Sequence, residues 1–258
     1  VPGTTVDRQC GSSQQAVHFA AQAIMSGTQD VVVAGGVQTM TQVPISSAML
    51  AGNALGFDDP FSGSSGWVAR YGSEPPTQFR SAQMIADKWG FSREQLEAYS
   101  LESHRRARQA IDEGRFDREV VPLGEIAMDE TVRDTSLEQM AQLDCLFGCD
   151  KVTAAVSSQT CDAAGAMLLV SETALKRYGL RPRARIAHMS VRGADPIWML
   201  TAPIPATAHA LQRAGMRLDD IDRVEVNEAF ASVPMAWLAE TEYPHEKTNV
   251  NGGAIALG

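Results

Sequence analysis

The sequence predicts an α/β protein, on three observations. A β-branched stretch at residues 1–10 leads through small residues into an alanine-rich helix, and an apolar strand follows at Val31–Ala34. The same order of strand, polar turn and apolar helix returns at residues 219–241. Helical patterns fill most of the chain between them. A strand, a helix and a strand in so short a span are typical of a parallel βαβ unit.

The first unit is expected to place a cysteine at a turn. The extended run ends at Cys10, and a helix is predicted from about Ser13 to Ser26, stopped by Gly27 and buried on most sides. Within it, His18 is interpreted as a core or face histidine. The strand at residues 31–34 is expected to be fully buried, because it is apolar throughout.

The middle of the chain changes character. Residues 41–76 are rich in Gly, Ser, Pro and Asp and are predicted to form loops and short elements. An amphipathic helix is expected at residues 81–89. Ser92 and Gln95 have the spacing of a capping box, which predicts a helix from there to about Glu113. Its basic cluster at residues 104–108 fits either a solvated helix face or a phosphate-facing patch.

The remaining elements are expected to alternate. After a polar connector at residues 129–133, the predicted helices are at 136–143, 171–178, 203–215 and 232–241, and the predicted strands at 152–156, 163–170, 184–191 and 219–226.

Composition restricts the class of function. The chain has 258 residues, 44% of them hydrophobic, and a net charge of −9, which argues against non-specific binding to nucleic acid or to anionic membranes. No apolar run is long enough to span a bilayer, and the first residues lack the basic-then-apolar pattern of a signal peptide, so none is expected. Four cysteines in a chain of this size favour a reducing cytoplasm. Cys145 and Cys149 lack the further ligands that a metal site needs, so none is expected.

Cys10 has two interpretations from its position alone. At the start of a helix, a thiol lies near the positive end of the helix dipole, which favours the reactive thiolate. Free cysteine is also among the most buried residue types, so Cys10 could simply pack like an alanine.

Five motifs, in order along the chain, together resemble the thiolases. The nucleophile motif of that family resembles Val6-Asp-Arg-Gln-Cys-Gly-Ser-Ser13 and its following strand resembles Val33–Met40. The pantetheine-binding segment resembles Val152–Gln159, the second-domain motif resembles Asn227-Glu-Ala-Phe-Ala231, and the run before the catalytic histidine resembles Asn249–Gly258. The resemblance covers essentially the whole chain.

The resemblance implies a thiolase fold. This is a duplicated, mixed five-stranded sheet in an α-β-α-β-α layering, with an inserted helical loop domain. The implied domains are a partial N-terminal domain at 1–41, a CoA-binding loop domain at 42–158, a return of the chain to the N-terminal domain at 159–182 and a partial C-terminal domain at 183–258. A homodimer or homotetramer is implied as well.

The resemblance also implies acyl transfer in fatty acid metabolism. Cys10 accepts the acyl group from a thioester, and a second acyl-CoA or CoA takes it in Claisen condensation or in thiolytic cleavage of a 3-ketoacyl-CoA. The backbone N–H of Cys10 is suited to one oxyanion, and Asn227 to the other, through a water. Without the family pattern, Asn227 would be interpreted as a helix N-cap.

CoA is implied as substrate, with no other cofactor. The apolar tunnel for pantetheine and acyl group corresponds to Leu143, Phe147, Ala154, Phe230 and Met199, and Ser158 to the serine that meets pantetheine. Arg133 corresponds to the nucleotide-binding loop. Two of these have simpler alternatives, since Arg133 fits an exposed loop and Met199 a core position.

Departures from the family pattern leave the substrate open. Thr77-Gln78-Phe79 stands where acetoacetyl thiolases have His-Met-Gly, and Asp7 stands where Asn is usual. None of the five histidines lies in the family's catalytic motif, so the 258-residue polypeptide is expected to be inactive by itself. Two alternatives follow, a non-catalytic CoA-binding protein and a ketoacyl synthase that condenses malonyl thioesters.

Overall fold

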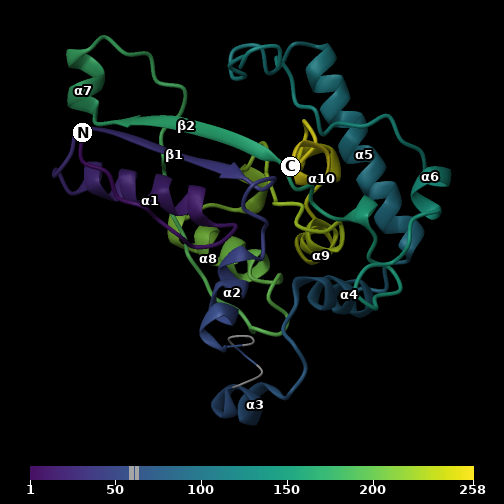
Figure 1. Ribbon diagram of the computed structural model, residues 1–258. Helices are drawn as coiled ribbons and strands as arrows, with labels where there is room; N and C mark the ends of the chain where they lie inside the picture. The colour runs from purple at the N-terminus through teal and green to yellow at the C-terminus, as the bar shows by residue number, and fades with distance from the viewer. Residues whose placement is uncertain (58–60, 62–63) are drawn as a thin grey trace. The chain divides into compact units, whose positions relative to one another are not determined.

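The computed structural model describes residues 1–57, 61 and 64–258, and they form two compact units. One unit comprises residues 1–44 and 161–189, and the other comprises residues 45–160 and 190–258. The helices and strands of each unit can be followed in Figure 1.

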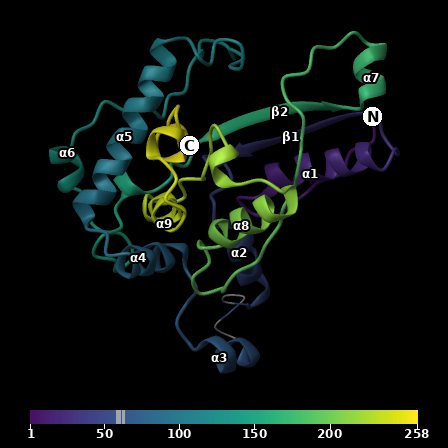
Figure 2. The same ribbon diagram turned by 180° about the vertical axis from the view of Figure 1, so that it is seen from behind.

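The first unit is an antiparallel ribbon with two helices. Strand β1 (Val31–Thr39) pairs with strand β2 (Asp162–Val170), in a register from Val31 opposite Val170 to Thr39 opposite Asp162. Helix α1 (Ser12–Met25) packs on the ribbon, and helix α7 (Glu172–Arg177) follows β2 (Figure 2). Alanines of α1 meet Ala34 and Leu169 in a small core, because small side chains let a helix approach a strand closely.

Three expectations for this unit are wrong. Residues 1–7 form no strand, and only a bridge between Arg8 and Cys10 is present there, so the parallel βαβ unit is not formed. Strand β1 is exposed except near Ala34, because only one of its edges is paired and helix α1 packs along only part of it. Helix α1 buries one side only, at His18, Ala20 and Ala21.

The second unit is built mainly from helices, with α5 as the longest at 20 residues. Its elements in chain order are α2 (Ser47–Leu50), η1 (Ala51–Leu55), α3 (Ser65–Tyr71), α4 (Gln78–Lys88), α5 (Arg93–Asp112), α6 (Leu137–Ala141), η2 (Ala154–Val156), α8 (Pro203–Ala214), η3 (Leu218–Asp220), α9 (Ser232–Thr241), η4 (His245–Lys247) and α10 (Ala254–Leu257).

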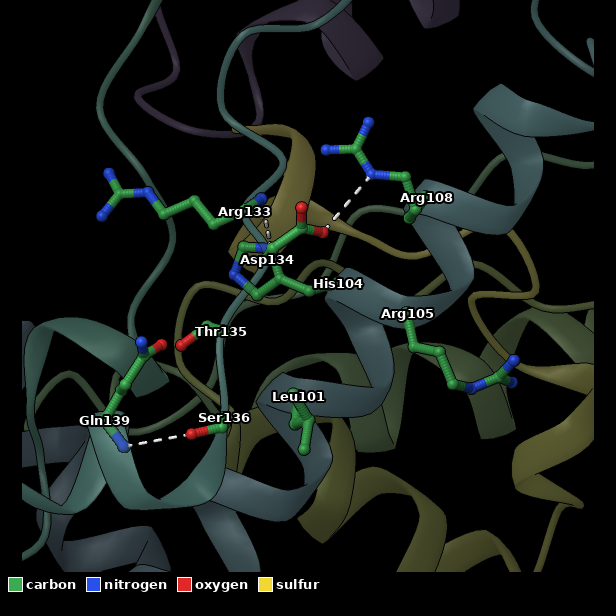
Figure 3. Close-up of a pocket in the computed structure, with 9 residues that line it drawn as sticks. All are labelled: Leu101, His104, Arg105, Arg108, Arg133, Asp134, Thr135, Ser136 and Gln139. Carbon is green, nitrogen blue, oxygen red and sulfur yellow. Dashed lines mark hydrogen bonds and ion pairs between the residues drawn. The ribbon is translucent and has the colours of Figure 1, made fainter.

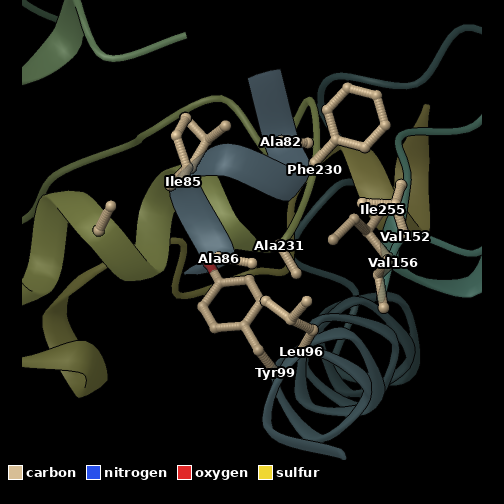
Figure 4. Packing of buried hydrophobic residues seen from close by; sticks show 12 residues of the cluster. Ala82, Ile85, Ala86, Leu96, Tyr99, Val152, Val156, Phe230, Ala231 and Ile255 are labelled. Carbon is tan, nitrogen blue, oxygen red and sulfur yellow. The ribbon is translucent and has the colours of Figure 1, made fainter. Parts of the chain in front are cut away.

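The main core of this unit lies where α4, α5, α9 and α10 meet (Figure 4). Ile85 of α4, Leu96 of α5 and Ile255 of α10 are each at most 1% exposed. The segment before α9 adds Phe230. Burial of such side chains stabilises a fold by about 1.5–3 kcal/mol each, so this cluster fixes the segment that carries Asn227 against α5.

Local signals in the sequence predict α1, α4, α5, α6, α7, α8 and α9, with shifts of a few residues at their ends. Ser92 accepts a hydrogen bond from the Gln95 N–H while the Gln95 side chain accepts from the Ser92 N–H, so the capping box at the start of α5 is confirmed. Ser136 and Ser171 cap α6 and α7 through their hydroxyls. The loops predicted at 41–76 contain only short helices where they are described; residues 58–60 and 62–63 of this stretch lie outside the described residues.

Three predicted strands are wrong. Residues 152–156 end in the 3-10 turn η2, residues 184–191 have no regular structure, and residues 219–226 contribute η3 and one bridge between Val224 and Thr248. The backbone is extended in places, but a strand exists only where a neighbour completes the ladder, and the sequence of one segment does not supply that neighbour.

The α/β class is confirmed, with one qualification on the sheets. The described residues contain a single sheet of two strands rather than five-stranded sheets. The domain boundaries at residues 41, 158 and 182 remain predictions. No helix in the described part of the chain is both long and apolar enough to cross a membrane.

Candidate active site

Cys10 lies in a closed turn immediately before α1. The turn is held by hydrogen bonds from the Gly11 N–H to the Arg8 carbonyl at 3.1 Å and from the Arg8 N–H to the Ser12 hydroxyl at 2.8 Å. Gln9 has a φ of 50°, which lets the chain reverse before the helix begins. Cys10 is exposed, so the alternative that it packs in a core like an alanine is wrong.

Asn227 is exposed on the second unit. The residue that caps α9 is Ala231, with no side-chain hydrogen bond, so the interpretation of Asn227 as an N-cap is wrong. In the part of the chain that the structure describes, the Asn227 carboxamide forms no hydrogen bond. It therefore has both its donor and its acceptor available. Cys10 and Asn227 belong to different compact units, and each is described within its own.

The residue after Asn227 is part of a buried polar network that the sequence analysis missed. Glu228 is 1% exposed and accepts hydrogen bonds from Tyr99 and Ser103 of α5. Burial and the nearby Glu228 raise the pKa of Tyr99, so its hydroxyl stays protonated and donates. One signal was visible in the sequence, since Tyr99 and Ser103 are four residues apart and therefore share one face of a helix.

The predicted pantetheine residues occupy one part of the second unit. Ser158 pairs with the segment after Asn227, because its N–H donates to the Ala229 carbonyl at 3.0 Å, and its hydroxyl donates to the Ala254 carbonyl at 3.3 Å. The Phe79 ring lies 4.2 Å from the Phe147 ring and 5.4 Å from the Phe230 ring, measured between centroids. The structure thus places Ser158 against the segment that carries Phe230, and it connects Phe147 to Phe230 through the Phe79 ring.

Four of the predicted apolar positions are exposed to solvent. Ala154 is exposed on η2, and Leu143 is 39% exposed, with its carbonyl accepting from Arg93 at 2.8 Å. Phe147 is 78% exposed and has a φ of 50°. Met199 is 38% exposed with a φ of 46°, so the alternative that it fills a core is wrong. Apolar side chains held at the surface in this way are available for a ligand.

A basic pocket with a volume of about 500 Å³ opens beside α5 (Figure 3). Arg105 and Arg108 come from the basic cluster of the helix, and Arg133 comes from the connector that follows. Its other lining residues are Leu101, His104, Asp134, Thr135, Ser136 and Gln139. The pocket therefore combines the two stretches that the sequence marked as candidates for phosphate and nucleotide.

The charges in this pocket are only partly compensated. Arg105 pairs with Glu102 at 2.6 Å, whereas Arg108 lies 3.8 Å from an Asp134 that is 95% exposed. The Arg133 guanidinium donates to a neutral partner, the side-chain amide oxygen Oε1 of Gln159, at 3.0 Å. Exposed ion pairs are weak, so Arg108 and Arg133 retain most of their capacity to bind an anion. The basic cluster is divided in role, because Arg106 is turned inward to the Thr248 carbonyl at 2.6 Å.

A second, smaller pocket of about 290 Å³ lies at the start of α4. It is lined by Thr77 and Arg80 of that region and by Phe147, together with Glu74, Pro75, Gln83, Met84, Gly148 and Cys149. Thr77 belongs to the stretch that departs from the family pattern, and it lines this pocket together with Phe147. Among the described residues, no group of three His, Cys, Asp or Glu side chains is arranged to hold a metal ion.

Comparison with known proteins identifies the family. Residues 1–173 match the model of the thiolase N-terminal domain, and residues 180–258 match that of the thiolase C-terminal domain. The steroid 3-ketoacyl-CoA thiolase FadA6 of Mycobacterium tuberculosis is 57% identical over 262 residues. This match covers 100% of the chain but 64% of that protein. A 3-ketoacyl-CoA thiolase of Idiomarina loihiensis is 41% identical over 273 residues, and this match covers 100% of the chain and 67% of that protein.

Solved structures agree with the sequence comparison. The crystal structure of human mitochondrial 3-ketoacyl-CoA thiolase matches with a TM-score of 0.85 and 36% identity, covering 100% of this chain and 68% of that one. A crystal structure of the same human enzyme in complex with CoA matches with a TM-score of 0.84. Two family models that together cover nearly the whole chain, and relatives above 40% identity, lead to one conclusion: the chain belongs to the thiolase family.

Proposed function

We propose that this chain carries acyl-transfer machinery of the 3-ketoacyl-CoA thiolase type, with Cys10 as the acyl acceptor. The observation that carries the proposal is the exposed thiol of Cys10 in the closed turn before α1. A nucleophilic thiol must be reachable by its substrate, and the exposed Cys10 meets this condition. The relatives named as 3-ketoacyl-CoA thiolases support the reaction class.

The proposed cleavage proceeds in two steps. The Cys10 thiolate attacks the 3-keto carbonyl carbon, the bond between C2 and C3 breaks, and the C2 carbanion takes a proton to leave as acetyl-CoA. The acyl group remains on Cys10 as a thioester. The thiol of a second CoA then attacks this thioester and gives up its proton, which releases the shortened acyl-CoA and regenerates the Cys10 thiolate. Condensation is the same sequence in reverse.

Asn227 is proposed to serve a developing oxyanion through a water. Its exposed, unbonded carboxamide supports this role, since the N–H₂ group can donate to a water or to a ligand. Donors of this kind typically contribute 10²–10³-fold to kcat in acyl-transfer enzymes.

The CoA molecule is proposed to lie along the second unit. Ser158, Ala154, Leu143, Phe147, Phe230 and Met199 would meet pantetheine and the acyl group, and the basic pocket with Arg105, Arg108 and Arg133 would receive the phosphates of the nucleotide. The human structure with bound CoA supports CoA as the ligand class. Arginine suits phosphate because its planar guanidinium can donate two parallel hydrogen bonds.

The proposed substrate is a 3-ketoacyl-CoA. The relative named as a steroid 3-ketoacyl-CoA thiolase makes a bulky, steroid-derived acyl group a specific candidate beside linear fatty acyl groups. The pocket near Thr77 and Phe147 is the place where acyl preference would be set, because the family pattern changes there. A homo-oligomer is proposed with it from the resemblance to the thiolases, and a cytoplasmic location because four cysteines in a chain of 258 residues favour a reducing compartment.

Thiolysis and thiol trapping together test the proposal. The full-length protein is incubated with linear and with steroid-derived 3-ketoacyl-CoA in the presence of CoA, and acetyl-CoA release is measured. Iodoacetamide should label Cys10 fastest, acyl-CoA should protect it, and Cys145, Cys149 and Cys161 serve as internal controls. Cys10→Ser should abolish release.

The alternatives give different results in the same assays. CoA binding with slow labelling of Cys10 and no release would contradict the enzyme and support a CoA-binding protein. Condensation only from malonyl thioesters would support a ketoacyl synthase instead.

A further inference from the structure

A carboxylate is buried directly beside the exposed Asn227. Glu228 is 1% exposed, and both of its carboxylate oxygens are filled by hydrogen-bond donors. Oε1 accepts from the Tyr99 hydroxyl at 3.0 Å and from Nδ2 of Asn249 at 2.9 Å. Oε2 accepts from the Ser103 hydroxyl at 2.7 Å and from the Ile255 N–H at 3.2 Å.

These four donors are neutral and come from three segments. Two belong to helix α5, one to residue 249 and one to the start of α10. A buried carboxylate is strongly unfavourable unless hydrogen-bond donors replace the water that it loses. Glu228 therefore holds the three segments together, since the folded state would be destabilised if any of these donors moved away. Its position in the fold is therefore fixed by α5, which is itself packed in the main core.

The backbone on both sides of Asn227 is held as well. The Asn249 carboxamide accepts from the Val226 N–H at 2.8 Å and donates to the Val226 carbonyl at 2.8 Å. On the other side, the Ala229 carbonyl accepts from the Ser158 N–H at 3.0 Å. Asn227 alone has a free, exposed side chain between these fixed neighbours. Such an arrangement limits the backbone freedom of one residue while leaving its side chain for a ligand.

We propose that Glu228 is a positioning residue, which holds the backbone of Asn227 so that its carboxamide is presented at a fixed place. The proposal rests on the proposed function, in which Asn227 serves an oxyanion. Glu228 touches no substrate in this scheme; it acts through residue 227. Oxyanion donors must be placed within about 0.5 Å of their working position, so loss of the network is expected to lower kcat more than substrate binding.

The experiment is a set of variants of the full-length protein. Glu228→Gln keeps the shape and removes the charge, and Ser103→Ala and Tyr99→Phe each remove one donor. The matched control is Ser100→Ala, because Ser100 is also fully buried on α5 but donates only to the Leu96 carbonyl of the same helix. Each of these changes is also made in an Asn227→Ala background. Thiolysis gives kcat and KM, and hydrogen exchange reports on the amides of residues 226–231.

The expected result is a selective loss. Glu228→Gln should lower kcat about tenfold with KM within about twofold, Ser103→Ala and Tyr99→Phe should lower it less, and Ser100→Ala should leave it unchanged. In the Asn227→Ala background, Glu228→Gln should have no further effect on kcat, since the two residues act as one unit. Exchange at residues 226–231 should be faster in the Glu228, Ser103 and Tyr99 variants only.

Two outcomes would overturn the proposal. One is a folded Glu228→Gln protein with wild-type kcat and wild-type exchange. The other is an equal loss of kcat with and without Asn227, which would mean a general structural role. If the wild-type protein shows no thiolysis at all, the proposed function fails, and the exchange measurement alone then decides whether Glu228 holds the Asn227 segment.

Discussion

The backbone N–H of Arg133 donates a hydrogen bond to Nδ1 of His104 across 3.2 Å. The bond attaches the connector that carries Arg133 to helix α5, and both residues line the basic pocket. It requires an unprotonated Nδ1, because a protonated imidazole nitrogen cannot accept. Burial, and to a lesser degree the charge of Arg133, lower the pKa of His104 and so keep this nitrogen unprotonated.

The stability of the protein should therefore fall in mild acid. Because the pKa of His104 is lower in the folded state, the unfolded chain takes up the proton first as the pH drops below about 6.5. The contribution is fully present above that pH and is lost below it. Burial lowers the pKa of His18 and His245 in the same direction. The free energy of unfolding, measured by urea denaturation, is expected to be smaller at pH 5.5 than at pH 7.5.

A substitution isolates the part due to His104. His104→Gln removes the titrating group but keeps a carbonyl that can accept from Arg133, so the loss of stability between pH 7.5 and 5.5 should be smaller than in the wild type. Gln139→Ala changes the same pocket without touching an imidazole and should keep the wild-type pH dependence. Equal dependence in His104→Gln would show that this bond is not pH-sensitive.

Charge in the basic pocket should govern affinity for CoA. Arg108→Ala and Arg133→Ala should each weaken CoA binding about tenfold in calorimetry, since a hydrogen bond to a charged group is worth about 1.5–3 kcal/mol. Binding of a pantetheine thioester without the nucleotide should not change. Arg217→Ala, which removes an 81% exposed arginine elsewhere, is the control. An equal loss of affinity for CoA and for the pantetheine thioester would show that this pocket does not bind the phosphates.

Gly253 should tolerate no side chain. A Cβ atom at this position would lie 2.4 Å from the carboxyl carbon of the buried Glu228, so Gly253→Ala should lower the free energy of unfolding by about 1–3 kcal/mol. Gly193→Ala is the matched control, because nothing lies within 4 Å of its Cβ, and its change should stay within about 0.5 kcal/mol. Equal stability of the two variants in urea would mean that the segment around Gly253 can move aside.

The start of helix α5 should depend on its cap. Ser92→Ala removes the acceptor for the Gln95 N–H and should cost about 1 kcal/mol of unfolding free energy. Ser92→Asp retains an acceptor and adds a favourable charge near the N-terminus, so it should remain close to the wild type. Thermal unfolding of the two variants at one pH provides the comparison, and an unchanged Ser92→Ala protein would contradict the assignment of the cap.

Local chemistry made the helices predictable, and distant partners made the strands unpredictable. The capping box at Ser92 and the stop at Gly114 depend on residues a few positions apart, and both lie where the pattern places them. A strand needs a neighbour from elsewhere in the chain. Residues 152–156 have the β-branched composition of a strand but form the turn η2, and the first residues before Cys10 find no ladder partner among the described residues.

The candidate site divides in the same way. Motifs identify Cys10, Asn227 and Ser158, because these residues belong to short runs that can be compared directly. The basic cluster on α5 also shows in the sequence, but its division between Arg106, which points inward, and Arg108, which faces the pocket, depends on tertiary contacts. The sequence does not indicate the role of Glu228, because its partners on α5 are 125 and 129 residues away.

The same long separations set an order of events when the chain is made. Tyr99, Ser103 and Arg106 of helix α5 have their partners at residues 228 and 245–249, so these polar groups remain in water until that later part has been synthesised. At about 5–20 residues per second, the wait is on the order of ten seconds. Helix α5 can form early by its own cap, but its packing against the Asn227 segment is a late event, when the Glu228 carboxylate loses its water.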